Sequence, residues 1–204
     1  MTLLAMAMRL YPGGTAFDPA APGHSFWFNF LCDLTNGVAV NGRPNPVGSE
    51  YARAAMLALA VALASFWIIL PALFHSRRRL AFATCASGLL SVGGLVAVPV
   101  ADGFMHVVAV FASSVPALVA GTLGIIGMMR ISPRTSNLLP GLALATVAAA
   151  LADSVLYARS YMVVPRIILP VLPLFQRLAL LLMLSWMTAV ALHILRSGRR
   201  AAPD

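Results

Sequence analysis

Long apolar runs separated by short polar segments occupy the chain from residue 51 to residue 195. A helix needs about 20 apolar residues to cross a bilayer, and lipid offers no hydrogen-bond partner to free backbone groups. The runs therefore predict membrane-spanning helices. We expect five of them, over residues 51–74, 80–99, 103–129, 138–157 and 165–195.

A shorter apolar segment, residues 1–10, begins the chain. It is too short to cross about 30 Å of hydrocarbon at about 1.5 Å per residue. It also lacks the basic start and small-residue cleavage site of a secretory signal peptide. We expect a short first helix with its N-terminus inside, and an interfacial segment is the alternative. The predicted fold class is all-α: residues 1–204 form a single polytopic transmembrane bundle of five full spans plus a short first helix.

Composition agrees with a membrane protein. Hydrophobic residues make up 60% of the chain and charged residues 10%, and the mean hydropathy is +0.89. Soluble domains average about 45–50% apolar and about 25% charged residues. This composition leaves no room for a second, soluble domain.

The basic residues are unevenly distributed. The net charge is +8, and all fourteen basic residues are Arg. Eight of them form three clusters: Arg77, Arg78 and Arg79; Arg130 and Arg134; Arg196, Arg199 and Arg200. Each cluster lies between or after apolar runs, as cytoplasmic anchors do under the positive-inside rule. The alternative use of the same residues is docking of anionic lipid head groups. Neither use calls for nucleic acid as a partner.

The acidic residues predict the same orientation. Five of the six lie at or near the side opposite the Arg clusters: Asp18, Asp33, Glu50, Asp102 and Asp153. We therefore expect a multi-pass protein of the cell membrane, a bacterial inner membrane, with its C-terminus in the cytoplasm. Membrane lipids are the expected partners, and other membrane subunits are a further possibility.

Residues 12–48 form a loop dense in Pro, Gly, Asn, Asp and aromatic residues. Turn signals such as Pro12-Gly13-Gly14 end the first apolar segment. Asn29 and Asp33 are four residues apart beside Trp27, which is typical of an amphipathic helix at the lipid–water boundary. We expect an extracytoplasmic cap, a short helix with flanking turns folded over the outer mouth of the bundle. The alternative is an interfacial anchor that covers nothing.

Polar residues in the spans suggest what lies under the cap. Ionisable side chains within a membrane usually face the bundle interior or a cavity. Asp102 and His106 share one helix face, and Arg177, about three turns into the last predicted span, needs a carboxylate partner. The predicted ligand-binding pocket lies in the outer half of the bundle, with Arg177 as its floor. Its residues are Asn29, Asp33, Asp102, His106, Asp153, Gln176 and Arg177.

Structural interpretations of the same residues remain open. Asp102 is also suited to a helix N-terminus, where the macrodipole favours a carboxylate. An Arg177–Asp pair could simply hold helices together. Pro170 and Pro173 should bend the last span.

Cys32 and Cys85 are too far apart for a disulfide, and the chain has no Cys-x-x-Cys motif, Cys/His cluster, nucleophile elbow or phosphate-binding loop. We therefore expect no metal and no cofactor, and assign no catalytic residue.

Short motifs at these positions resemble a bacterial and archaeal family of six-helix membrane proteins of unknown function. That family is distantly similar to the damage-regulated autophagy modulators and to GPI-anchor lipid-remodelling membrane proteins. The resemblance covers residues 10–195. It rests on Pro12-Gly13-Gly14, Phe26, Asn29, the Cys32–Thr35 stretch "CDLT", Asn41-Gly42, Asn45, Asp102 with His106, Gln176-Arg177 and Trp186. Family members usually read Ser-Asp-Leu-Gly where this chain reads "CDLT". The resemblance implies a six-helix bundle with an outward polar pocket and no established activity.

Three functional hypotheses follow from the sequence. The first is binding or handling of a lipid or other hydrophobic small molecule in the outward-facing pocket. The second is an accessory structural subunit of a larger membrane complex, in which the polar residues are structural. The third is a membrane-embedded hydrolase that uses Asp/His general-base chemistry, although no nucleophile accompanies the pair.

Overall fold

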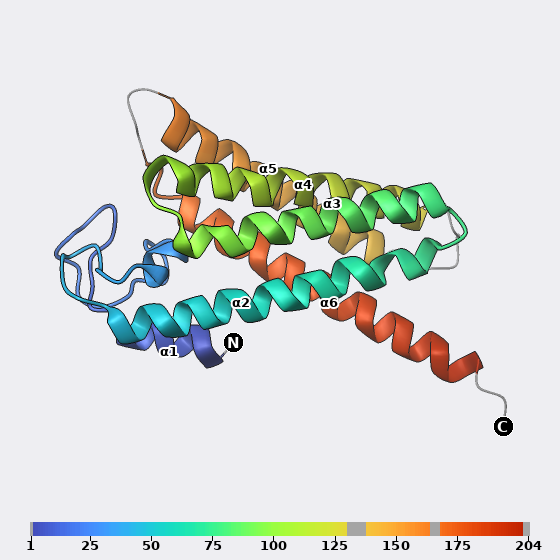
Figure 1. Cartoon of the computed structure of the whole chain (residues 1–204), viewed down its shortest axis with the longest axis horizontal. Coiled ribbons are helices and arrows are strands. Elements are labelled where there is room, and N and C mark those ends of the chain that lie inside the picture. Colours follow the sequence, from blue (N-terminus) through green and yellow to red (C-terminus); the bar gives the residue numbers. More distant parts are fainter. Residues whose placement is uncertain (1, 130–137, 164–167, 202–204) are drawn as a thin grey trace.

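The chain forms a bundle of helices with a folded cap at one end (Figure 1). The computed structural model describes residues 2–129, 138–163 and 168–201, and side chains as far as residue 197. The α-helices are α1 (Thr2–Leu10), α2 (Pro46–Ile69), α3 (Arg78–Ala97), α4 (Gly103–Met129), α5 (Leu138–Met162) and α6 (Leu172–Ala201). Three short 3-10 helices are η1 (Cys32–Thr35), η2 (Leu70–Phe74) and η3 (Val98–Val100). The all-α prediction is confirmed.

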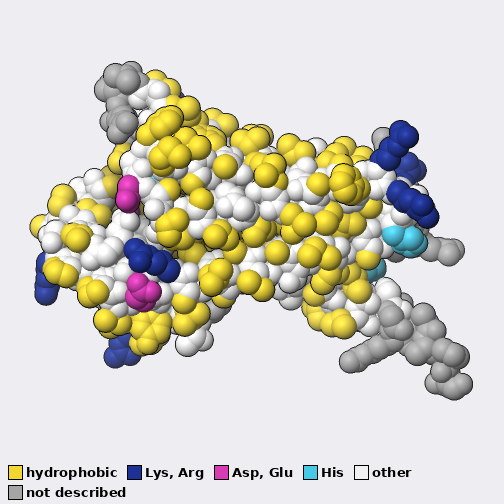
Figure 2. Space-filling model, viewed as in Figure 1, with side chains coloured by type: hydrophobic (Ala, Val, Ile, Leu, Met, Phe, Trp, Pro, Cys, Tyr) yellow, Lys and Arg dark blue, Asp and Glu magenta, His cyan; other side chains and the backbone are white. Residues whose placement is uncertain are grey.

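Five of the helical segments are long and apolar enough to cross a membrane. They are Pro46–Phe74, Arg78–Val100, Gly103–Met129, Leu138–Met162 and Leu172–Ser197. Helix α1 has only nine residues. On the face shown in Figure 2, hydrophobic side chains are spread along the length of the molecule, while charged groups gather at its two ends. The prediction of five spans and a short first helix is confirmed, and the chain is an integral membrane protein.

Prolines lie at two of the helix starts that differ from the prediction, those of α2 and α6. Helix α2 begins at Pro46 rather than at residue 51, because proline is favoured in the first turn, where its missing N–H has no helical partner. Helix α6 begins at Leu172; residues 165–167 of the predicted span lie outside the described residues. Pro170 precedes α6 and Pro173 lies in its first turn, so the predicted bend within the last span is wrong. The proline inside a helix is Pro116 in α4.

Helices α3 and α4 approach each other closely at Gly94. A Cβ at Gly94 of α3 would collide with the backbone of Ala112 and Ser113 in α4. Pro116 has no N–H to donate to the Ala112 carbonyl, so α4 lacks one helical hydrogen bond at this contact. The absence of a side chain at Gly94 allows the two backbones to pack directly, as small residues do in membrane bundles.

An aromatic cluster fills the middle of the bundle. Trp67 of α2 and Trp186 of α6 are both almost fully buried, with ring centroids 6.0 Å apart. Phe66 packs edge-to-face on each of them, with centroids 4.9 Å away. The Trp67 ring lies against Gly88 of α3, where a Cβ would overlap it. These contacts join α2, α3 and α6 into one core.

Residues 11–45 form the cap at the end of the bundle opposite the α2–α3 loop (Figure 1). Two isolated β-bridges, Gly13–Pro22 and Val38–Pro44, organise its turns. Gly14 has a φ of +85°, and a Cβ there would collide with the Asn41 backbone N. The helical element of the cap is the single 3-10 turn η1, which is shorter than the amphipathic helix expected from the sequence.

Candidate functional site

Asn29 is the centre of the cap. Its side chain is fully buried and makes three hydrogen bonds. The Oδ1 atom accepts from the Ser25 N–H (2.8 Å), and Nδ2 donates to the Gly14 carbonyl (2.7 Å) and to Asp33 Oδ2 (3.0 Å). One amide therefore connects three parts of the cap, the farthest of them 15 residues from Asn29 in sequence.

Arg177 of α6 binds the backbone of the cap. Its side chain is 4% exposed, and Nη1 and Nη2 donate to the carbonyls of Pro173 and Asn29, each at 2.8 Å. The guanidinium also lies 4.9 Å from the centre of the Phe26 ring, within cation–π distance. The third donor position, Nε, is buried without a hydrogen-bond partner.

The expected carboxylate partner of Arg177 is absent. Within the described residues the only ion pair closer than 4 Å is that between Arg53 and Glu50, at 3.3 Å. Two carbonyl dipoles solvate Arg177 instead, and its place near the start of α6 corrects the predicted depth of three turns. Carbonyl groups stabilise the cation without cancelling its charge.

Gln176 makes the second attachment between α6 and the cap. Its Oε1 accepts from the Leu31 N–H at 2.9 Å, across 145 positions of sequence. Adjacent side chains of one helix turn thus bind two successive parts of the cap backbone. This double attachment fixes the cap over the start of α6.

Asp33 is linked to Arg177 through Asn29. Its Oδ2 accepts from the Phe30 N–H (2.9 Å) and from the Asn29 side chain. Burial raises the pKa of the Asp33 carboxyl above its usual 3.8, although the Asn29 amide, the Phe30 N–H and the charges of Arg177 and His106 each lower it. Burial thus outweighs the stabilising partners, and the net effect is a raised pKa of Asp33.

Two residues that the sequence did not place in the site, Tyr11 and His24, lie beside this network. Their rings meet edge-to-face with centroids 6.0 Å apart, and the Tyr11 hydroxyl accepts from the Val40 N–H (3.1 Å). Burial, followed by the nearby charge of Arg177, lowers the pKa of His24 from 6.5 to about 4. The ring is therefore neutral at pH 7, and its Nε2 is buried without a partner. The sequence signal was only a histidine between two turns.

The other three predicted pocket residues lie on neighbouring helices. His106 Nδ1 bonds the Val98 carbonyl at 3.0 Å; because a carbonyl only accepts, this nitrogen carries a proton. Asp102 is exposed just before α4, and its backbone carbonyl accepts from the His106 N–H. Asp153 is half-buried on α5. The structure thus joins Asn29, Asp33 and Arg177 by hydrogen bonds and attaches Gln176 to the cap through Leu31. The side-chain hydrogen bonds of the described residues do not connect the other three to this network.

Cys32 and the Asp102–His106 pair are the residues that bear on the predicted hydrolase chemistry. Burial, together with the charge of Asp33, raises the pKa of the Cys32 thiol to about 12, so a thiolate is not formed at neutral pH. Asp102 and His106 meet through backbone atoms rather than as an acid–base pair of side chains. In the described ranges no three His, Cys, Asp or Glu side chains are grouped so as to hold a metal ion.

A cavity of about 220 Å³ opens beside Arg177, between α1 and α6. Helix α1 packs on α2, and α6 packs on α5. The cap residues Phe26 and Leu31 line the cavity between α1 and α6. All the lining side chains except Arg177 are apolar. They are Leu4, Ala5 and Met8 of α1, Phe26 and Leu31 of the cap, and Arg177, Leu180 and Leu181 of α6. The site therefore combines one buried cation with an apolar wall.

Comparisons with family models, with curated proteins and with solved structures give no significant match to this chain. The family resemblance drawn from the sequence stays a prediction.

Proposed function

We propose that this integral membrane protein binds a single-chain anionic amphiphile, such as a fatty acid, in the cavity between α1 and α6. One observation carries the proposal: Arg177 is 4% exposed, lines an apolar cavity, and has a buried Nε–H without an acceptor. A buried cation is costly unless an anion or strong dipoles surround it. A carboxylate beside Nε supplies the missing acceptor and the missing negative charge.

The cavity volume supports one acyl chain rather than a whole phospholipid. Ligand pockets for drug-sized molecules usually enclose about 300–1,000 Å³, whereas this cavity has about 220 Å³. Leu181 and Phe26 line it and are 51% and 46% exposed, so the cavity reaches the lipid-facing surface. The head group lies at Arg177, and the far part of the chain remains in the bilayer.

Binding of oleate, compared with the neutral oleyl alcohol, tests this proposal. The wild-type protein in mild detergent should bind oleate more tightly, and Arg177→Met should weaken oleate binding at least about tenfold, because a charge-assisted hydrogen bond is lost. Native mass spectrometry counts the bound molecules. Hydrogen exchange at the Leu31 amide reports whether the variant has also loosened the cap.

A pair of tryptophan variants separates the role of the cavity from that of the cap. Ala5→Trp fills the cavity without removing any cap hydrogen bond, whereas Ala58→Trp places the same side chain on an exposed position of α2. We expect Ala5→Trp to abolish oleate binding and Ala58→Trp to leave it unchanged. Equal oleate binding by both tryptophan variants would overturn the proposal.

Helix α6 favours a second function, that of a subunit in a larger membrane complex. Only 11% of its most apolar window is buried, against 22–28% for the other four spans. Its exposed residues include Leu178, Leu192 and Leu195. If α6 contacts a partner, cross-linking in intact membranes should give a discrete larger species through an α6 site. In that case no small molecule should be retained on purification, and Arg177 serves only to hold the cap.

A further inference from the structure

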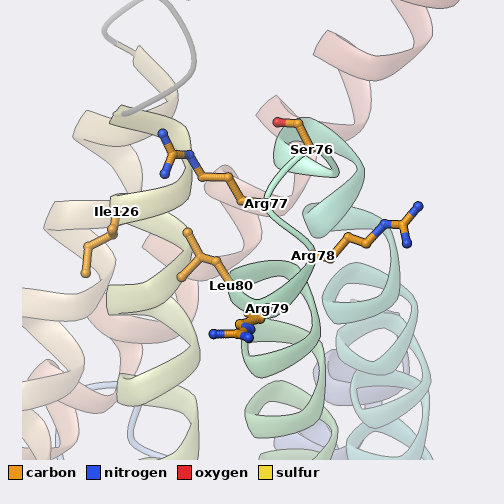
Figure 3. Close-up of a pocket in the computed structure, with 6 residues that line it drawn as sticks. All are labelled: Ser76, Arg77, Arg78, Arg79, Leu80 and Ile126. Carbon is orange, nitrogen blue, oxygen red and sulfur yellow. The ribbon is translucent and has the colours of Figure 1, made fainter.

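A second cavity lies at the end of the bundle opposite the cap. It has a volume of about 510 Å³ and lies where the loop from α2 to α3 passes the last turn of α4. Its lining residues are Ser76, Arg77, Arg78, Arg79, Leu80 and Ile126 (Figure 3). Because it joins the ends of three spans, it lies at the level of the bilayer surface, distant from Arg177.

The three arginines do not surround this cavity equally. Figure 3 shows the side chains of Arg77 and Arg79 extending toward α4, with Leu80 between them and Ile126 on the facing helix. The side chain of Arg78 extends from the other side of the loop. Two guanidinium groups thus flank an apolar floor.

The charge of this site is uncompensated. All three arginines are exposed, and within the part of the chain that the structure describes none forms an ion pair with a carboxylate. Helix α3 starts at Arg78 and has no acidic residue in its first turn, so the positive end of its macrodipole adds to the cations. If these arginines served only to set the orientation of the protein in the membrane, two of them would not need to extend toward the same cavity.

The geometry points to a binding site for the head group of an anionic phospholipid, held by Arg77 and Arg79. The phosphodiester has one negative charge and several acceptor oxygens, which guanidinium groups bind well. Leu80 and Ile126 provide an apolar surface for the glycerol and the first acyl carbons. The adjacent apolar floor favours a lipid over a free phosphate ion. This site is separate from the cavity at Arg177 and does not depend on the function proposed for it.

Lipid retention measured by native mass spectrometry tests the site. The protein is exchanged into mixed micelles containing dioleoyl phosphatidylglycerol or dioleoyl phosphatidylcholine, in an Ala5→Trp background that blocks the other cavity. We expect one phosphatidylglycerol to be retained in preference to phosphatidylcholine. The Arg77→Gln/Arg79→Gln double variant should lower this affinity about tenfold or more, because each basic residue near a membrane surface contributes to anionic lipid binding.

Two arginines outside this cavity provide the matched control. An Arg43→Gln/Arg196→Gln variant removes the same total charge from exposed positions but leaves the cavity lining intact, and it should retain phosphatidylglycerol as the parent does. Equal losses in the two double variants would show general charge attraction and overturn the site. Loss of bound phosphatidylglycerol on adding millimolar inorganic phosphate at constant ionic strength would indicate a soluble phosphate site and overturn the lipid assignment.

Discussion

At the scale of single residues, the cap is held by unusual pairings of buried polar groups. The Arg177 guanidinium donates to the carbonyls of Pro173 and Asn29, and the side-chain amide of Asn29 donates to Asp33. Desolvation favours the neutral forms of both Asp33 and His24. Because carbonyl dipoles rather than a carboxylate hold the Arg177 guanidinium, an anionic ligand is a suitable further partner for it.

His24 predicts a pH dependence of the cap. Its pKa is about 4 in the folded protein and 6.5 in the unfolded chain. Between these two pH values the unfolded chain therefore binds more protons than the folded protein. The contribution of neutral His24 to the free energy of unfolding is fully present above pH 6.5 and is lost as the pH falls toward 4. The ring is only half-buried, and solvent screening reduces the effect to about 1 kcal/mol. Asp33, whose pKa is raised, contributes in the opposite direction as its carboxyl becomes protonated.

Thermal unfolding in detergent at pH 7, 5.5 and 4.5 isolates the contribution of His24. The stability of wild type should fall more steeply with acidification than that of His24→Gln, which cannot titrate. A His193→Gln variant, near the other end of α6, should follow wild type. Parallel pH curves for wild type and His24→Gln would contradict the prediction.

At the scale of elements, helix packing depends on where side chains are missing. The α3–α4 contact requires Gly94, because its Cα lies directly against the α4 backbone next to Ser113. At its neighbour Gly93, a Cβ would meet no atom within 4 Å, so this position faces away from the contact. The sequence "VGGLV" contains both glycines and does not distinguish them.

Alanine substitutions test this distinction. Gly94→Ala should destabilise the protein by about 1–3 kcal/mol, because overpacking forces the helices apart. Gly93→Ala should leave stability unchanged or increase it by up to about 1 kcal/mol, the gain in helix propensity of Ala over Gly. Comparison of the two midpoints of thermal unfolding in one detergent checks the prediction. Similar midpoints would show that α3 and α4 do not approach at Gly94.

At the scale of the whole molecule, the two ends of the bundle differ in chemistry. One end carries the cap and the starts of α2 and α4 with the exposed carboxylates Glu50 and Asp102, and the other carries the Arg77–Arg79 loop between α2 and α3 (Figure 1). Arginines occur at the cap end too, including Arg53, which pairs with Glu50. The uncompensated basic cluster is therefore the feature that predicts orientation, with the α2–α3 loop in the cytoplasm.

Single-cysteine labelling tests this orientation. In a Cys32→Ser/Cys85→Ser background, Ala20→Cys in the cap should react with a membrane-impermeant maleimide on intact cells. Ser76→Cys in the α2–α3 loop should react only after the membrane is opened. Both positions are exposed, so access to reagent should depend on the membrane alone. The reverse pattern would place the Arg cluster outside.

The sequence by itself determined the class of protein and the number and approximate limits of its spans. These properties depend on local hydropathy and on the penalty for unsatisfied backbone groups in lipid, which act along the chain without reference to packing. The sequence also indicated that Asn29, Asp33, Gln176 and Arg177 belong to one polar region. It could not determine that Arg177 bonds the Asn29 carbonyl rather than a carboxylate, because that contact joins positions 148 residues apart. The cavity between α1 and α6 and the different environments of two adjacent glycines were likewise decided only by tertiary structure. Each depends on which helix faces meet, and nearly uniform apolar helices do not encode that choice in their periodicity.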